Sequence, residues 1–487
     1  MSDKESPQRA PFDPRIMIAE TESEIALSEE APAPQAYPRA LESKAIKGTY
    51  YVIGSYGLAM ALRLGGSVVL TRLFAPDYFG LMNLLTTIMV GLLLISHIGL
   101  QDSVIQNPRG DEPVFLNTAW TLQVIRGAVL FLITIPLAWP VAHFYPEIGS
   151  RPHLIWMLPV LGFGCFLAGV TSPNLLHLSR HIGLGRLSAL ESGTQAFQLL
   201  ITIVWAYYWR SIWVLVWSRV IAEFARSVVS YFMHPQLRPR FTWDKPIVRE
   251  LVHFGRWILV GTALNFLALQ SDRLILGKLT TMQMLGIYGI AFTLSDVPRQ
   301  IILQFSSRVG FPFIAKFIDR PRPEFRSIVL KYRMPALLVG AAMLVAVVCF
   351  GDVFILHVFD KRYHEAAWMV AIFAVGLWHT MLYSTISPAI MALQKSHYNA
   401  VAYAVYCVAL FIALPLGFHY WGMVGAVIAV AASDLPVYFV NLYSGYREGV
   451  GTLGQDLKLT FAFLTLLAVS LTARAFLGFP SPFPHLP

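Results

Sequence analysis

Charged side chains within long apolar stretches are the residues of this sequence best suited to bind or transfer charge. Arg63 lies near the middle of one such stretch, where Tyr56, Arg63 and Ser67 are spaced to share one face of a helix. Arg126 lies near the middle of another, and neither arginine has an acidic residue three or four positions away. A charge at the centre of a bilayer costs about 2.5–3.5 kcal/mol on insertion scales, so both arginines need a compensating interaction.

Two interpretations of these arginines are compatible with the sequence. Each can bond across helices to another side chain or to backbone carbonyl groups, or it can form part of the cationic wall of a cavity that binds an anion. Two arginines without local acidic partners favour the anion cavity. The residues that we predict to line it are Arg63, Arg126, Arg299 and Arg273.

Aspartates within apolar stretches are candidates for binding a proton or a cation. Asp296 and Asp434 each lie two residues before a proline, which removes a backbone hydrogen bond and should bend its helix. Asp434 has no basic residue at helical spacing, so it is the first candidate, followed by Asp296 and Asp272. The alternative is that these aspartates only bond to neighbouring helices.

The residue spacings that indicate an enzyme or a metal site are absent from the sequence. The histidines form neither an H-x-x-H nor an HExxH pairing, and the three cysteines lie inside apolar stretches. No nucleotide-binding glycine loop or nucleophile elbow occurs in a suitable context. We therefore expect no enzymatic activity, no metal, and no cofactor beyond a coupling proton or Na⁺ ion.

The elements that position these residues follow from the composition. Of the 487 residues, 56% are hydrophobic and 13% are charged, whereas soluble domains have about 45–50% apolar and about 25% charged residues. Apolar stretches of roughly 20 residues, which is long enough to cross a bilayer, recur from residue 46 onward. This pattern excludes a soluble enzyme, a disordered scaffold and a fibre. We expect an all-α polytopic membrane protein.

Thirteen stretches are predicted to cross the membrane. They lie at about 48–74, 79–103, 114–140, 153–178, 186–208, 211–233, 251–277, 282–306, 330–356, 366–391, 397–418, 421–443 and 457–478. The loops on one side, to which we assign Arg333, carry most of the lysines and arginines. By the positive-inside rule this places the N-terminus in the cytoplasm and the C-terminus on the periplasmic side. The thirteenth stretch has the least polar content and is a candidate for a peripheral addition.

The predicted organisation has five parts. The first is acidic and proline-rich with few large apolar residues, so we expect it to be disordered. The parts are a disordered acidic cytoplasmic tail (1–45), an N-terminal six-helix lobe (46–233), a basic cytoplasmic linker (234–250), a C-terminal six-helix lobe (251–444), and an extra transmembrane helix with the outer C-terminus (445–487).

An internal repeat supports the division into two lobes. At a constant offset of 206 residues, Arg72 aligns with Lys278 and Gly80 aligns with Gly286. Each copy is a short turn with a basic residue, followed by a glycine that opens the next helix. Because the offset covers six predicted stretches, the two halves would have parallel topology about an axis along the membrane normal. This predicts two pseudo-symmetric six-helix lobes around a central cavity.

Three short patches carry a resemblance to a known family. They are LFAPDYFGLM at 73–82, GLQDSVIQ at 99–106, and LQSDRLILG at 269–277 followed by LGIY at 285–288. In combination they resemble the Wzx-like polysaccharide flippases of the multidrug/oligosaccharidyl-lipid/polysaccharide superfamily, over roughly 46–444. The resemblance implies a twelve-helix core of two lobes. It also implies alternating-access flipping of an undecaprenyl-diphosphate-linked oligosaccharide across the bacterial inner membrane, for exopolysaccharide or O-antigen synthesis.

The physical chemistry of such a substrate fits the predicted site. A diphosphate with sugars cannot cross hydrocarbon unaided, because its charges and hydroxyl groups would be left unsatisfied. Central arginines would offer it charge-assisted hydrogen bonds. The expected partners are the lipid-linked oligosaccharide, the membrane and a polysaccharide polymerase or export machinery, and not nucleic acid.

Two other functions are compatible with the sequence. A cation-coupled drug or metabolite exporter of the same superfamily would depend on Asp434, Asp296 or Glu191 more than on the arginines. A non-transporting membrane partner of the polysaccharide polymerase would depend on the tail and the loops.

Overall fold

The computed structural model describes residues 39–97, 99–150, 152–180, 184–233, 239–395 and 397–483, and this part of the chain contains helices and no β-strand. Residues 1–51 and 52–487 form two separate units. Of the predicted tail, residues 1–38 lie outside the described residues, whereas residues 39–45 are helical. The helix contacts and the polar cavity belong to the second unit.

The helices are divided between two halves of the chain. The first half contains α2 (Arg39–Leu73), α3 (Pro76–Ile95), α4 (Leu100–Gln106), α5 (Pro113–Phe144), α6 (Pro146–Gly149), α7 (Pro152–Ile155), α8 (Met157–Gly169), α9 (Asn174–Arg180), α10 (Leu184–Tyr208) and α11 (Ile212–Phe232). The second half contains α12 (Lys245–Leu279), α13 (Met282–Ser295), α14 (Val297–Phe305), the π-helical turn η1 (Ser306–Gly310), α15 (Phe311–Ala315), α16 (Arg322–Val358), the 3₁₀ turn η2 (Lys361–Tyr363), α17 (Ala366–Ala392), α18 (His397–Ala432), α19 (Leu435–Arg447) and α20 (Leu453–Phe476). Each of the thirteen predicted stretches falls on one helix or on a run of consecutive helices.

Proline and glycine account for several of the breaks between helices. The junction of α13 and α14 lies just before Pro298, and the junction of α18 and α19 lies just before Pro436. Proline lacks an N–H donor and is tolerated in the first turn of a helix, where that donor would have no partner within the helix. The helices are therefore interrupted just before these two prolines. A further kink within α18 lies at Gly422, whose φ of 57° is one that other residues rarely adopt.

Several helices are suited to a bilayer by length and composition. Within the described ranges, six helical segments are long and apolar enough to cross a membrane, and a bent pair at His153–Gly169 and Asn174–Arg180 raises that number to seven. The six segments are α3, α5, α16, α17, the α18–α19 segment and α20. The chain is a multi-pass helical membrane protein, and the number of thirteen crossings stays a prediction.

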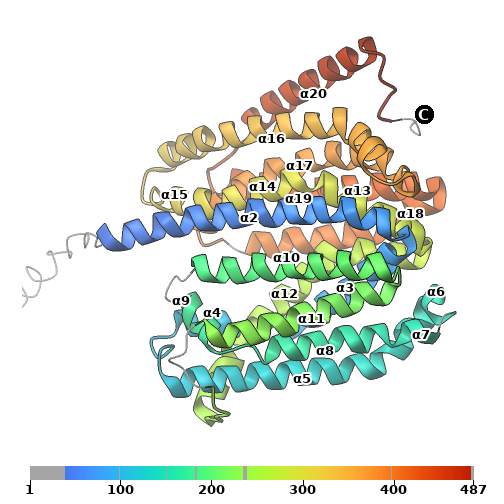
Figure 1. Ribbon diagram of the computed structural model, residues 1–487. Coiled ribbons are helices and arrows are strands. Elements are labelled where there is room, and N and C mark those ends of the chain that lie inside the picture. The colour runs from blue at the N-terminus through green and yellow to red at the C-terminus, as the bar shows by residue number, and fades with distance from the viewer. Residues whose placement is uncertain are drawn as a thin grey trace, which may run out of the picture. The chain divides into compact units, whose positions relative to one another are not determined.

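The helices pack in two groups that correspond to the two halves of the chain. In the first half α5 packs on α8, α8 on α11 and α11 on α10, whereas in the second half α16 packs on α17, and α17 on α18 and α19. Figure 1 shows α5, α8 and α11 together at the bottom of the view and α16 with α17 near the top. The halves meet where α3 packs against α12 and α13. This is the expected architecture of two helical lobes with one additional C-terminal helix.

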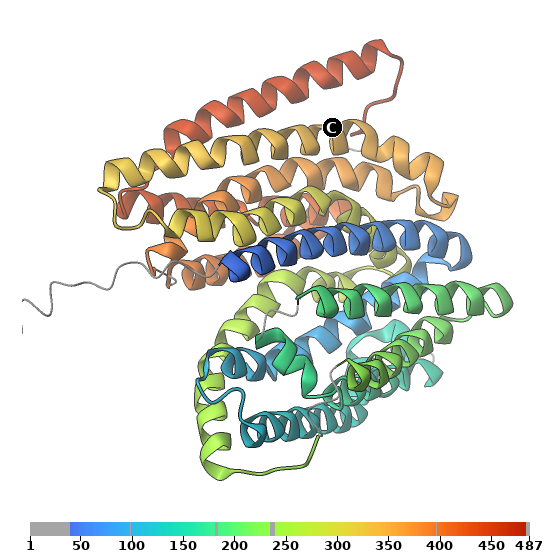
Figure 2. The same cartoon turned by 60° about the vertical axis from the view of Figure 1, so that its left-hand side comes forward.

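A buried ion pair near each end fixes α20 to α16. Near the start of both helices, Nη2 of Arg333 lies 2.9 Å from Oδ1 of Asp456. Near their ends, Arg474 pairs with Asp352, and these two side chains are also buried. One ion pair joins the N-terminal parts of the two helices and the other joins their C-terminal parts, so the helices run parallel. Both views show α20 alongside α16 (Figures 1 and 2). The thirteenth stretch is therefore anchored in the second lobe and is not a loosely attached addition.

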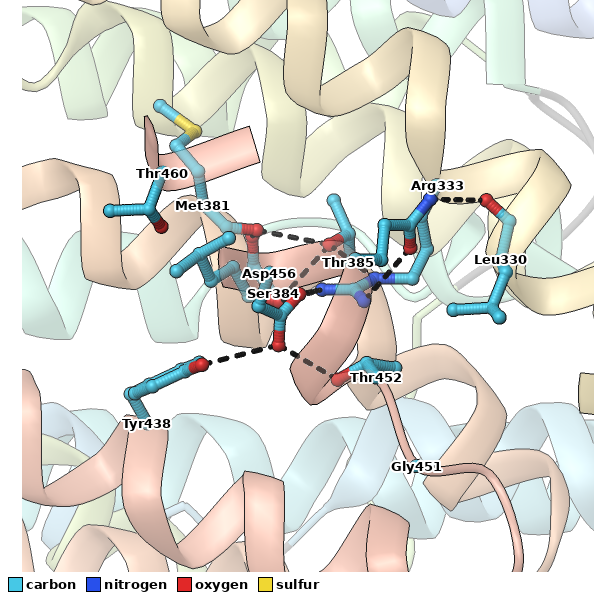
Figure 3. A network of polar contacts seen from close by, with 12 residues as sticks. Leu330, Arg333, Met381, Ser384, Thr385, Tyr438, Gly451, Thr452, Asp456 and Thr460 are labelled. Carbon is cyan, nitrogen blue, oxygen red and sulfur yellow. Dashed lines mark hydrogen bonds and ion pairs between the residues drawn. The ribbon is translucent and has the colours of Figure 1, made fainter. Parts of the chain in front are cut away.

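The prediction that Arg333 is a cytoplasmic loop cation is wrong. Its side chain is fully buried and donates hydrogen bonds to Thr385 and to the carbonyl group of Leu382 on α17, as well as pairing with Asp456 (Figure 3). Asp456 also accepts a hydrogen bond from Tyr438 of α19. A buried charge persists only when its partners satisfy it, and here three helices supply those partners.

Candidate functional site

A polar cavity lies between helices of both lobes. Its volume is about 610 Å³, and its walls are formed by α2 and α3 from the first half and by α12, α13, α14, α17, α18 and α19 from the second. The charged residues that line it are Arg63, Arg273, Arg299, Asp272, Asp296 and Asp434. The structure therefore brings together six of the seven residues that the sequence predicts for the site.

Asp296 lies at the junction of α13 and α14 and is the centre of one polar cluster. Arg299 donates to both of its carboxylate oxygens, with Nη2 and Oδ2 3.0 Å apart. Gln300 also donates to Oδ2 of Asp296, at 2.7 Å. The carbonyl oxygen of the Gln300 side chain in turn accepts a hydrogen bond from the Tyr56 hydroxyl at 3.1 Å. The charge of Arg299 is thus compensated within one turn of its own helix, and the cluster reaches α2.

Asp272 and Arg273 are neighbours in the chain but have different partners. Asp272 accepts a hydrogen bond from the hydroxyl of Tyr288, a fully buried residue of α13. Arg273 donates to Gln270, and its guanidinium carbon lies 5.4 Å from the centre of the Phe292 ring. Nε of Arg273 is buried without a hydrogen-bond partner among the described residues. Arg273 therefore retains one donor that a ligand could use.

Asp434 caps the start of α19, and its carboxylate is held by hydroxyl groups. Thr380 and Tyr383 of α17 donate to it, and the Tyr383 oxygen lies 3.4 Å from Oδ1. In the part of the chain that the structure describes, no basic side chain forms an ion pair with Asp434. Carboxylate and hydroxyl oxygens are the ligands that hard cations prefer, so this group is the one in the cavity best suited to take up a proton or a cation.

Arg63 is the cavity arginine that has no partner among the residues that the structure describes. Its side chain is exposed to the cavity, and neither a hydrogen bond nor an ion pair joins it to another described residue. A guanidinium group carries five N–H donors in a planar fork that matches the oxygens of phosphate. Arg63 is therefore the group of this cavity that is most available to bind an anion.

Arg126 does not line this cavity and has a different role in the structure. Its Nη2 donates to the carbonyl oxygen of Leu93 at 2.7 Å, and its Nε donates to Oγ of Ser96 at 3.1 Å. Because α3 ends at Ile95, the Leu93 carbonyl is one of the last four of the helix and has no acceptor role within it. A cation at that end also interacts favourably with the helix dipole. Of the two interpretations of Arg126, the structure matches the bond to a backbone carbonyl.

The remaining residues of interest divide into those inside and those outside the cavity. Glu191 is exposed on α10 and is not among the lining residues. Gln300, Tyr383 and Tyr288 hold the cavity aspartates and were not foreseen from the sequence. Only Gln300 has a sequence signal, since it follows Asp296 by one helical turn. In the described ranges, no three His, Cys, Asp or Glu side chains are grouped to hold a metal ion.

The fold and the cavity define the class of the protein, which is that of multi-pass helical membrane proteins built from two lobes around a central cavity. The lipid II flippase MurJ in an inward closed conformation has a similar structure, with a TM-score of 0.70 at 10% identity, over 86% of this chain and 92% of that chain. An inward-facing multidrug-resistance transporter of the MATE family has a TM-score of 0.66 at 12% identity, over 80% of this chain and 94% of that one. The expected fold class is confirmed.

The family follows from the sequence comparisons. Residues 69–368 match the family described as polysaccharide biosynthesis protein, and the chain belongs to that family. Relatives include the teichuronic acid biosynthesis protein TuaB of Bacillus subtilis, which is 22% identical over 53% of this chain and 53% of its own length. The lipopolysaccharide biosynthesis protein WzxC of Escherichia coli is 21% identical over 57% of this chain and 56% of its own length. The chain thus spans about half the length of these relatives, and the predicted Wzx-like family is confirmed.

Proposed function

We propose that this chain is a flippase that moves an undecaprenyl-diphosphate-linked oligosaccharide repeat unit from the inner to the outer leaflet of the bacterial inner membrane. The movement would occur by alternating access and would supply exopolysaccharide or O-antigen synthesis, without a chemical step. Membership of the polysaccharide biosynthesis family and a fold shared with a lipid II flippase support this function. The observation that carries the proposal is the guanidinium of Arg63, which lines the cavity between the lobes and has no hydrogen-bond or ion-pair partner within the described ranges.

Arg63 supplies what the diphosphate of such a substrate requires. A diphosphate cannot enter hydrocarbon without losing its hydration, and a planar arginine fork replaces that hydration with two charge-assisted hydrogen bonds. Arg299 is less available because Asp296 already accepts from it. Arg273 is a second guanidinium in the lining of the same cavity. The sugars would then face the amide and hydroxyl groups of the walls, while the polyprenyl chain stays in the lipid.

Asp434 is the residue that we propose for ion coupling. The cavity is lined by three arginines and three aspartates, so a bound diphosphate adds negative charge to a site that is otherwise balanced. Uptake of a proton or a Na⁺ ion at a carboxylate would offset that charge. Asp296 already has an arginine as a partner and Asp272 a tyrosine, whereas the hydrogen-bond partners of Asp434 in the described part of the chain are hydroxyl groups. Asp434 is therefore the preferred site for the coupling ion.

The orientation and the partners belong to the same proposal. The concentration of lysine and arginine in one set of loops supports a cytoplasmic N-terminus and a periplasmic C-terminus in the bacterial inner membrane. The flipped repeat unit would be passed to a polysaccharide polymerase or export machinery on the outer side.

The experiment that tests this function locates the substrate after loss of the chain. Deleting the gene should cause lipid-linked repeat units to accumulate in the cytoplasmic leaflet, because synthesis continues while translocation stops. Accumulation in the outer leaflet would instead indicate a partner of the polymerase. In that case deletion of residues 1–43 should abolish function, whereas a flippase lacking the tail should keep its core activity.

A cation-coupled exporter of drugs or metabolites is the second candidate function. The observation that favours it is the half-buried carboxylate of Asp434, which has hydroxyl partners and no ion pair among the described residues. An exporter would confer resistance to its substrates, and Asp434→Asn would remove that resistance while Arg63→Ala would not. In a flippase, by contrast, Arg63→Ala would stop translocation of the lipid-linked oligosaccharide.

A further inference from the structure

The helices α3 and α13 approach each other through two glycines in a reciprocal contact. A methyl group at position 80 would lie 1.8 Å from the carbonyl oxygen of Met282, and one at position 286 would lie 2.0 Å from the carbonyl oxygen of Pro76. Because Cβ atoms essentially never come within 3.0 Å of such an atom, only glycine allows this approach. The offset of 206 residues relates Gly80 to Gly286 and also Pro76 to Met282. Each half therefore uses the same surface to contact the other, as in an isologous interface.

This contact lies at one end of the central cavity. Pro76 and Met282 are the first residues of α3 and α13, so the contact is at the face of the protein that carries the turns at 74–75 and 280–281. In the proposed orientation this is the outer face. Phe79, Met82 and Gly286 of the two helices also line the cavity. One helix from each lobe thus closes the outer end of the cavity.

Hydrogen bonds between the two halves surround the glycine contact on the same face. Glu147 accepts a hydrogen bond at 3.0 Å from the first N–H group of α13. The Tyr363 hydroxyl donates to the carbonyl group of Phe74 at 3.1 Å, and Arg72 donates to the carbonyl group of Val358 at 3.1 Å. Water can replace bonds of this kind at a small net cost. The glycine contact is different, because the two backbones approach each other more closely than a residue with a Cβ atom would allow.

We propose that the contact of Gly80 and Gly286 is the outer gate of the transport cycle, closed in this structure and separated when the cavity opens to the outer face. Close packing of the two backbones at the glycines joins the helices here. Such an interface can separate and close again at low cost, which a switch between two states of similar free energy requires. The proposal relies on the proposed function for the cargo, whereas the opening itself can be measured without any substrate.

Thiol labelling from the outer face tests the gate. A cysteine is placed in the cavity as Thr293→Cys, in a background where Cys165, Cys349 and Cys407 are replaced by alanine, and spheroplasts are treated with a membrane-impermeant maleimide. Adding Gly80→Ala or Gly286→Ala should raise the labelling rate about tenfold, because the new methyl group destabilises the closed contact by roughly 1.4 kcal/mol or more. Gly65→Ala is the matched control, since a Cβ there meets nothing within 4 Å. Unchanged labelling of correctly inserted Gly80→Ala protein would overturn the proposal.

A crosslink provides a second test that does not depend on a destabilising substitution. A Cβ at position 289 would lie 2.4 Å from Nδ2 of Asn83, so cysteines at these two positions can join α3 to α13 next to the gate. The oxidised Asn83→Cys, Gly289→Cys protein should lose both outer labelling of the cavity and translocation, and dithiothreitol should restore both. If the oxidised protein labels as fast as the reduced one, the gate lies elsewhere. If oxidation lowers the labelling rate and reduction restores it, but no lipid-linked oligosaccharide is translocated in either state, the result supports the gate and contradicts the proposed function.

Discussion

Arg63 and Arg299 line the same cavity but differ in their partners. Arg299 donates to both oxygens of Asp296, whereas Arg63 has no hydrogen-bond or ion-pair partner among the described residues. An arginine with a carboxylate partner is already compensated, so a ligand must compete with that partner. An arginine without one gains its compensation from the ligand. This difference supports the proposed anion-binding role of Arg63 rather than Arg299.

Replacing Arg63 should therefore stop translocation without removing the protein from the membrane. Arg63→Ala loses charge-assisted hydrogen bonds that contribute about 1.5–3 kcal/mol each, which corresponds to a loss of at least about tenfold in rate. Arg63→Lys keeps the charge without the planar fork and should be intermediate. The measurement is the translocation rate per molecule of membrane-inserted protein. Arg186→Ala, an exposed position on α10 outside the cavity lining, is the control, and equal rates for both alanine variants would contradict the assignment.

Arg126 should affect stability instead of transport. Arg126→Met removes the guanidinium hydrogen bonds to the Leu93 carbonyl and to Ser96, while the Ser96 hydroxyl still donates to that carbonyl. Hydrogen bonds from a charged group contribute about 1.5–3 kcal/mol each. We expect a lower melting temperature of the purified protein and a nearly unchanged translocation rate per folded molecule. Arg126→Lys should recover part of the stability. A variant with normal stability and no translocation would show that Arg126 contacts the substrate.

Asp434 should control the dependence of transport on an ion gradient. The charged and titratable groups around it are Arg299, His379, Tyr383, Tyr403 and Tyr406. Asp434→Asn keeps the shape and cannot take up a proton, so translocation by the variant should no longer respond to a pH or Na⁺ gradient, while binding of the substrate is retained. Asp319→Asn, at an exposed position, should respond like the wild type. A gradient response that persists in Asp434→Asn would move the coupling site to another residue.

The buried pair of Arg333 and Asp456 should show strong coupling in stability. Arg333→Met leaves Asp456 as an unpaired buried charge, which costs about 3–5 kcal/mol, and the double variant Arg333→Met, Asp456→Leu should be much closer to the wild type. Thermal unfolding of the four proteins in detergent gives the coupling energy as a double-mutant cycle. Additive effects of the two single substitutions would show that the pair does not hold α20 in place.

The sequence predicts the helices better than their ends. Apolar stretches and prolines locate the helical stretches and the helix breaks before Pro298 and Pro436, because length and backbone chemistry are local properties. The end of α3 at Ile95 was not foreseen, since the predicted stretch continues to 103 through Gly99, which adopts a left-handed conformation before α4. That break frees the carbonyl group that Arg126 caps. An arginine inside an apolar stretch therefore indicates an interaction without identifying its partner.

The partners of the site residues depend on tertiary packing. Asp434 and Tyr383 come from different helices, and so do Asp272 and Tyr288, and no periodicity in the sequence relates the members of either pair. Arg333 shows the same limit, because its burial depends on α20 lying along α16. The repeat that aligns Gly80 with Gly286 is an exception. There a sequence offset identifies two residues that meet in the structure.

Translocation in proteoliposomes that contain the purified chain is the measurement that tests the flippase function most directly. A short undecaprenyl-diphosphate-linked oligosaccharide is placed in one leaflet, and its transfer is followed by a glycosidase or lectin that reaches only the other leaflet. We expect transfer well above that of protein-free vesicles, lost in Arg63→Ala and kept in Arg186→Ala. Transfer at the protein-free rate by correctly folded wild-type protein would contradict the account.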